Sequence, residues 1–241
     1  MSVIDFTRRS DAHELMETES VSFDDFRECL QDLARVNRLT FAARPTLLFL
    51  ERLVATFGHI ERPIEVLDVG SGFGDTLRAV HTWATRRRVS VALTGIDRNP
   101  WATRAAEQST PPDQHIEWVT DDIFSYRPPR PVDVVISSQF THHLTDALLI
   151  RFLGWMESTA RLGWFVSDLH RHPLPYHFFR FFSKAARFHR FVQHDGPVSI
   201  ARSFSRGDWQ RFIEGMNIVG GSAKIEWRMP FRFTVARLKR P

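Results

Sequence analysis

A glycine-rich stretch from Glu65 to Asp75 carries the strongest chemical signal in the chain: Glu-Val-Leu-Asp-Val-Gly-Ser-Gly-Phe-Gly-Asp. The apolar run 64–69 predicts a buried strand before the glycines, and residues 76–80 predict a helix after them. Glycines let a ligand approach the main chain, and free N–H groups at a helix start favour a polar or anionic ligand group. A tight turn without any ligand is the alternative interpretation.

Polar residues also end the next three predicted strands. Asp97 ends the apolar run 89–96, and an acidic residue at the tip of a second strand can bind both hydroxyls of a ribose. Asp122 and Ile123 end a third, short strand and suit an adenine amino group held between apolar side chains. The fourth predicted strand is followed by small polar residues and two histidines, among them Ser138, His142 and His143.

Together these motifs resemble the class I S-adenosylmethionine-dependent methyltransferases, of the bacterial small-molecule O- or C-methyltransferase type. A nicotinamide cofactor fits less well, because the third glycine comes one residue too early for Gly-x-Gly-x-x-Gly. The resemblance implies S-adenosyl-L-methionine as the cofactor and a Rossmann-like, seven-stranded, mostly parallel sheet with an antiparallel C-terminal hairpin and helices on both faces. The residues expected to bind the cofactor are Asp68, Gly70, Ser71, Gly72, Gly74, Asp97, Arg98, Asp122, Ile123, Ser138 and Arg44.

Length and composition limit the possible number of domains, disulfides and membrane spans. The 241 residues suit one domain with a full core, and the single cysteine, Cys29, excludes an internal disulfide and favours a reducing, cytoplasmic setting. No apolar run reaches the roughly 18 residues of a membrane span. The net charge of +4 is mildly basic and, without clustering, says little about partners. No nucleic-acid partner is expected. With 21 Phe and 7 Trp against 2 Tyr, the chain has an aromatic surplus that predicts an apolar pocket.

The predicted organisation is an N-terminal helical cap over residues 1–60, followed by a methyltransferase domain over residues 61–241. Residues 1–21 show no period and are expected to be loosely held. Ser22 caps a first helix, and a second helix starts at Arg44-Pro45 and stops at Gly58. In the resembled family such helices cover the cleft, and Arg44 could reach the methionine carboxylate. From Glu65 onward strands and helices alternate, which predicts a parallel sheet covered on both faces.

A Phe-rich insertion over residues 170–202 follows the fifth predicted strand. Seven residues are expected on the apolar side of one continuous helix: Phe178, Phe179, Phe181, Phe182, Ala185, Phe188 and Phe191. Three interpretations stay open. The helix is a lid over the substrate, a packing or dimer face in a monomer or homodimer, or a segment (176–192) that lies on a membrane surface.

Candidate catalytic residues follow from where ligands sit in such sheets, beyond the carboxyl ends of the strands. His170 is the first candidate for a general base, followed by His142, and transfer without any side-chain base is the other alternative. His143 matches a histidine that is often structural in the resembled family. A metal-assisted reaction would need several converging carboxylates, and Asp168 alone suits that role, so we expect no metal.

The expected function is methyl transfer to a small apolar acceptor, a phenol or quinol-like metabolite, at oxygen. This acceptor class comes from the resemblance alone. The alternatives are C-methylation of a quinone or polyketide intermediate and a cofactor-binding protein that does not transfer methyl. RNA methylation fits less well, because Ser138–Thr141 stands where an Asn/Asp-Pro-Pro-aromatic motif would be.

Overall fold

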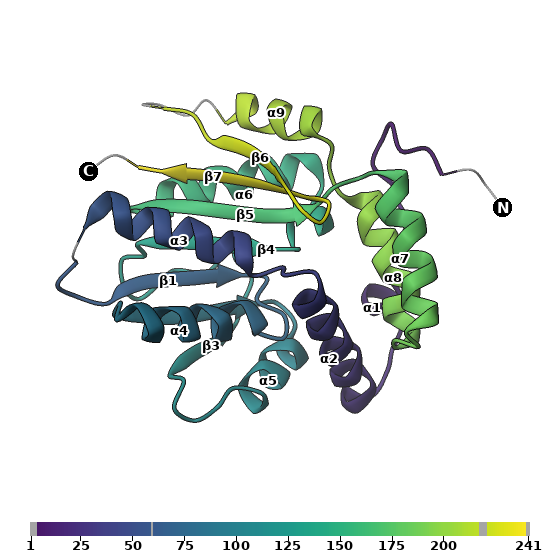
Figure 1. The fold of residues 1–241 in the computed structure, drawn as a ribbon, viewed down its shortest axis with the longest axis horizontal. Helices are drawn as coiled ribbons and strands as arrows, with labels where there is room; N and C mark the ends of the chain where they lie inside the picture. The colour runs from purple at the N-terminus through teal and green to yellow at the C-terminus, as the bar shows by residue number, and fades with distance from the viewer. Residues whose placement is uncertain (1–3, 59, 217–220, 240–241) are drawn as a thin grey trace.

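The computed structural model of this protein describes residues 4–58, 60–216 and 221–239 (Figure 1). The helices are α1 (Leu15–Thr18), α2 (Phe23–Leu39), α3 (Arg44–Phe57), α4 (Asp75–Arg87), α5 (Pro100–Gln108), α6 (Asp146–Thr159), α7 (Pro173–Ala185), α8 (Arg190–Arg202) and α9 (Arg206–Gly215), with a 3₁₀ turn η1 (Thr141–His143). The strands are β1 (Ile64–Val69), β2 (Val91–Asp97), β3 (Ile116–Thr120), β4 (Val134–Ser138), β5 (Gly163–Leu169), β6 (Lys224–Arg228) and β7 (Arg232–Leu238).

The strands form one sheet of seven in the order β3-β2-β1-β4-β5-β7-β6 among the described residues. The first five strands are parallel, and β7 inserts antiparallel between β5 and β6. The order in which the chain adds strands to the sheet reverses between β1 and β4, which leaves a crevice at the carboxyl ends of these neighbours. This Rossmann-like arrangement confirms the predicted fold class.

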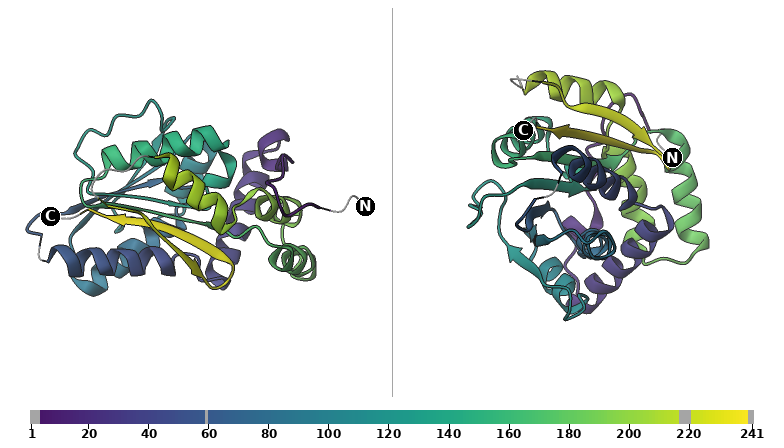
Figure 2. Two further views of the ribbon diagram at one scale, coloured as in Figure 1. Left: turned by 90° about the horizontal axis from the view of Figure 1, so that it is seen from above. Right: turned by 60° about the vertical axis from the view of Figure 1, so that its left-hand side comes forward.

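The two faces of the sheet are covered by different helices. Successive side chains of a strand point to opposite faces, so a strand that is apolar throughout needs cover on both. In β1, Ile64 and Val66 belong to the core packed against α3 and α4, whereas Leu67 and Val69 belong to the core packed against α6 and α9. Figure 2 shows the sheet between these two helical layers. The central strands are therefore buried on both sides, which explains their continuous apolar sequences.

Four further segments gather at the end of the sheet toward which β1 points: α1, α2, α7 and α8 (Figure 1). Helix α8 contacts α1, α2 and α7. The Ser22 hydroxyl accepts a hydrogen bond from the Asp25 amide, so α2 begins where its cap predicts. Among the described helices, none is both long and apolar enough to cross a membrane.

The Phe-rich segment is two helices, so the prediction of one continuous helix is wrong. Helix α7 ends in a left-handed turn at Arg187, with φ of 51°. The Phe188 amide bonds to the Ser183 carbonyl and the Arg187 amide to the Lys184 carbonyl, which is the pattern that closes many helices. Glycine usually occupies this left-handed position. Because arginine stands there, the sequence carries no visible stop signal.

The N-terminal segment is also better held than its sequence predicts. The Arg9 guanidinium donates to the Arg202, His142 and Leu144 carbonyls. The Asp195 carboxylate accepts from the amides of Leu15 and Met16, at 2.7 and 3.1 Å. Residues far apart in the chain thus fix the described part of this segment against α8 and the carboxyl edge of the sheet.

Candidate active site

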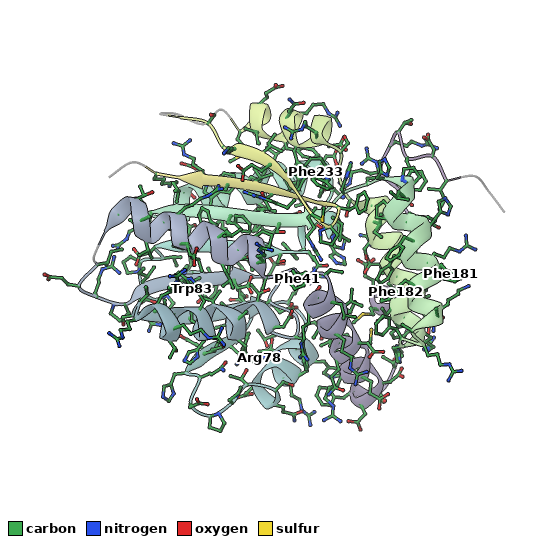
Figure 3. All side chains as sticks on the ribbon, in the orientation of Figure 1. Phe41, Arg78, Trp83, Phe181, Phe182 and Phe233 are labelled. Atoms are coloured by element: carbon green, nitrogen blue, oxygen red, sulfur yellow. The ribbon has the colours of Figure 1, made fainter. Side chains whose placement is uncertain are left out.

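A cavity of about 730 Å³ lies at the carboxyl edge of the sheet. This volume is in the range of small-molecule and cofactor sites, about 300–1,000 Å³. The glycine turn after β1 lines one part of it, and Phe178, Phe179, Phe182 and Phe191 of α7 and α8 line another. Phe181 lies on the outer side of α7 and is 75% exposed (Figure 3). The cavity therefore joins a polar turn to an aromatic compartment.

Asp97 holds the glycine turn in place. Its Oδ2 accepts from the Gly72 amide at 3.0 Å, and its Oδ1 accepts from the Asn99 amide at 2.9 Å. The Gly70 and Ser71 amides both donate to the Ile96 carbonyl. Burial raises the pKa of the Asp97 carboxyl, although these backbone hydrogen bonds oppose the rise. The tip of β2 and the turn after β1 are thereby one rigid unit.

The predicted cofactor residues divide into two groups. Five of them line the cavity: Asp68, Gly70, Ser71, Gly72 and Ser138. The others do not belong to its lining among the described residues.

Each residue of the second group has a visible role or position. A Cβ at Gly74 would come within 2.2 Å of the Trp118 ring, so this glycine is needed for packing. Asp122 accepts from the Phe124 amide, and Ile123 is buried in the core on the α6 face. Arg98 and Arg44 are exposed, and the placing of Arg44 at the methionine carboxylate stays a prediction.

Two buried, oppositely charged side chains in the cavity have atoms without hydrogen-bond partners in the described part of the chain. They are Asp68, through Oδ1, and Arg232, through Nε and Nη1. Arg232 is 2% exposed, and its Nη2 donates to the Thr40 hydroxyl at 3.1 Å. Burial raises the pKa of Asp68 well above its ordinary value and lowers that of Arg232 to about 10. Such groups are costly to bury alone, so they suit a charged ligand.

Helix α2 is tied to the glycine turn by a chain of side chains. The Asn37 amide donates to Asp75 Oδ2 at 3.1 Å, and the Gln139 amide donates to Asn37 Oδ1 at 2.7 Å. Asp75 opens α4, directly after the last glycine. These bonds place α2 across the cavity, beside the residues that follow β1 and β4.

A second polar group in the cavity is built from His142, His143 and Glu14. His142 Nδ1 lies 2.8 Å from Asp168 Oδ1, and His143 Nδ1 lies 2.7 Å from Glu17 Oε1. The Nε2 atoms of both rings face Glu14, at 3.6 and 4.0 Å from its two carboxylate oxygens. Glu14 Oε1 also accepts from the Ser199 hydroxyl at 2.8 Å. The cluster joins the N-terminal segment, η1, β5 and α8.

Charge pairing dominates the protonation of this cluster. Burial disfavours the charged His142 ring, but the Asp168 and Glu14 carboxylates outweigh it and raise the pKa of His142 to about 9. Burial likewise opposes the charged Asp168, but the adjacent His142 lowers its pKa to about 2. The pKa of Glu17 is also lowered, despite burial, by His143 and Arg202.

His170, the first candidate for the base, does not line the cavity among the described residues. Its ring lies 4.7 Å from that of Phe233, and its Nδ1 accepts from Trp227 Nε1 at 3.3 Å. Burial, together with His172 and Arg171, lowers the pKa of His170 to about 4. The structure therefore brings His142 and His143 to the cavity and leaves His170 between β5 and the C-terminal hairpin.

Two residues of this site were missed by the sequence interpretation: Glu14 and Arg232. Glu14 lies in a segment without periodicity. Arg232 lies in a strand where apolar and polar residues alternate, a pattern that predicts exposure of its charged residues. The one available signal is that Arg232 begins the last strand, opposite the end of β5, where Leu169 is its partner in the register.

The comparison with known proteins agrees with this geometry. Residues 41–213, well over half of the chain, match the family model for a methyltransferase domain. No curated protein sequence matches the chain.

Solved structures with the same fold include the plantazolicin methyltransferase BpumL in complex with SAH, at 13% identity and a TM-score of 0.65, covering 90% of this chain and 96% of that chain. The magnesium protoporphyrin IX methyltransferase (ChlM) from Synechocystis PCC 6803 with bound SAM has 14% identity and a TM-score of 0.56, with 92% of each chain covered. The CMeT domain of the citrinin polyketide synthase has 14% identity and a TM-score of 0.60, covering 83% of this chain and 52% of that chain.

The sheet order and the glycine turn at the carboxyl edge define a class I methyltransferase fold. This chain belongs to the methyltransferase domain family.

Proposed function

We propose that this protein transfers the methyl group of S-adenosylmethionine to the hydroxyl oxygen of a small, apolar, phenolic or quinol-like acceptor. The observation that supports this most strongly is the shared cavity, in which the glycine turn, a Phe-lined compartment and two histidines meet. The aromatic walls favour an apolar acceptor. The His142 and His143 imidazoles favour an acceptor whose hydroxyl group loses its proton, as O-methylation requires.

In this proposal, the enzyme acts mainly by positioning. The sulfonium already activates the methyl carbon, so the acceptor oxygen must be held in line at about 3–3.5 Å while water is excluded. Helices α7 and α8 cover the cavity and suit the role of the predicted lid. Contact of residues 176–192 with a membrane surface stays a separate prediction, which would use the exposed Phe178 and Phe181.

The direct test is transfer of labelled methyl by purified protein to a panel of phenols, quinols, amines and RNA. We expect label in the phenols or quinols, on oxygen. Label confined to ring carbon, to amines or to RNA would contradict the proposed acceptor class. Cofactor binding without any transfer to the panel would favour the non-catalytic alternative.

Asp97 is proposed to bind the two ribose hydroxyls of the cofactor. Each charge-assisted hydrogen bond contributes about 1.5–3 kcal/mol, so Asp97→Ala should weaken SAH binding at least about tenfold by calorimetry. Asp113→Ala, which removes an exposed carboxylate from another loop, is the control. Unchanged affinity in a folded Asp97→Ala protein would remove this residue from the cofactor site.

Asp68 and Arg232 are proposed to hold the zwitterionic methionine end of the cofactor. Asp68 would face its ammonium group, and Arg232, in place of Arg44, its carboxylate. Both side chains interact electrostatically with Asp75, which opens the helix after the glycine turn. The Asp68 and Arg232 atoms that lack hydrogen-bond partners among the described residues therefore lie around one end of this turn.

Replacing Arg232 by methionine should weaken SAH binding about 10- to 100-fold, because a charge-assisted contact is lost. Binding of 5′-methylthioadenosine, which lacks the amino-acid end, should stay unchanged. Arg237→Met is a matched control, since Arg237 is a buried arginine of the same strand that pairs with Glu157 instead. Equal losses for both ligands would contradict this role, and a raised KM for the acceptor alone would assign Arg232 to the acceptor.

A further inference from the structure

Glu14, His142 and His143 have the spacing of a metal-ligand set. One ligand atom from each lies within 4.8 Å of the others. The two separations between imidazole Nε2 and carboxylate oxygen, 3.6 and 4.0 Å, exceed hydrogen-bond length. Ligands about 2.0–2.2 Å from one tetrahedral zinc ion are about 3.3–3.6 Å apart. The three side chains therefore need only a small inward movement to share an ion.

The carboxylates that face the Nδ1 atoms of both histidines also support a metal-ligand arrangement. A metal-binding histidine usually donates its second ring N–H to a carboxylate, which fixes the ring and the tautomer. Here Asp168 lies 2.8 Å from His142 Nδ1, and Glu17 lies 2.7 Å from His143 Nδ1. Both rings are thereby held with Nε2 directed at Glu14. One histidine paired with a carboxylate is common in proteins. Two such pairs whose histidines both face one further carboxylate form a preorganised set of ligands.

The charge of the cluster also calls for a cation. Three carboxylates, those of Glu14, Glu17 and Asp168, surround the two imidazoles. Arg202 lies 2.9 Å from Glu17 and 3.7 Å from Glu14, and Arg232 interacts electrostatically with Asp168. With neutral imidazoles, which metal binding requires, the three carboxylates and two guanidinium groups leave one negative charge, so a cation is favoured there.

We propose that Glu14, His142 and His143 bind a divalent transition-metal ion of the zinc type. Two imidazoles and one carboxylate are the ligand set of zinc sites that keep a position open for water or substrate. The cluster lines the same cavity as the glycine turn and the lid phenylalanines, so the open position faces the acceptor compartment. Ion binding is independent of the proposed function, whereas the role of the ion in catalysis depends on it.

In catalysis, the ion would act as a Lewis acid on the acceptor hydroxyl and lower its pKa. The acceptor hydroxyl gives its proton to solvent as it binds the ion, before water is excluded from the site. The oxygen then uses a lone pair to form the O–CH₃ bond, and the C–S bond breaks with its electron pair going to sulfur. The sulfonium becomes a neutral thioether, so the step needs no oxidant or reductant.

The test is binding of Zn²⁺, by titration calorimetry, to protein stripped with a chelator, together with the visible absorption bands of bound Co²⁺. We expect one equivalent of ion per chain and the intense bands of a four- or five-coordinate site. His143→Ala and Glu14→Gln should each lower the affinity for Zn²⁺ at least about a hundredfold. This loss exceeds the roughly 10- to 100-fold typical when a residue that only hydrogen-bonds to a metal ligand is replaced. The His143 side chain is 32% exposed, so its removal leaves a folded protein.

His115→Ala, an exposed histidine in a distant loop, is the control and should bind like the natural sequence. Absence of a stoichiometric site, or equal affinity in His143→Ala and the unmodified chain, would overturn the metal site. The assay contains no acceptor, so this outcome is separate from failure of the acceptor panel. If metal-free protein methylates its acceptor at the full rate, the activating role is refuted even where the ion binds.

Discussion

Replacing Gly72 by valine should abolish S-adenosylmethionine binding in a protein that still folds. A Cβ at this position meets no protein atom within 4 Å, because it points into open space at the cavity. The new side chain would therefore occupy the place proposed for the cofactor and not disturb the core. We expect affinity to fall at least about a hundredfold, on the order of 3 kcal/mol, by calorimetry with SAH.

The backbone conformation calls for a control of its own, since Gly72 has a φ of 51° and valine is strained there. Gly58→Val provides it. Gly58 has a φ of 71° and equally open surroundings, but it ends α3 away from the cavity. Gly58 also has a ψ of −151°, a conformation essentially restricted to glycine, so Gly58→Val should lose at least as much thermal stability as Gly72→Val. The Gly72 variant alone should lose the cofactor. Retained SAH binding by folded Gly72→Val would mean that the glycine turn is not the cofactor site.

Replacing His142 by asparagine should lower turnover about 10²- to 10⁴-fold while cofactor affinity stays near normal, in line with the usual effect of a group that handles the acceptor proton or its charge. The asparagine amide can still donate to Asp168, as His142 Nδ1 does in the structure, so the buried carboxylate keeps a partner. The Nε2 side of the ring, which faces the cavity cluster, is lost. The measurement is single-turnover transfer to the acceptor found in the panel.

His170→Asn is the matched comparison, because His170 lies outside the cavity lining of the described residues. We expect it to change turnover no more than about threefold, typical of a residue that does not contact the reacting atoms. The reverse result, with His142→Asn active and His170→Asn inactive, would reinstate His170 as the base. It would also require the C-terminal hairpin to move on substrate binding.

Most elements of this fold were predictable because their signals are local. Ser205 and Asp208 form the expected reciprocal cap of α9, and Arg44-Pro45 opens α3 as predicted. The glycine turn after β1 is equally local, since the strand, the turn and the helix follow each other directly. A single left-handed arginine, Arg187, was enough to defeat the prediction for the Phe-rich segment, because nothing in its side chain indicates that conformation.

Whether a feature of the site could be predicted from the sequence depends on how far apart its residues lie in the chain. By itself the sequence determined the glycine turn and the alternation of strands and helices, because those groups are close together in the chain. Only the folded chain brought Glu14 against His142 and Ser199, and Arg232 beside Thr40. These partners are remote in sequence, and their buried charges become visible only when the contacts that surround them are known.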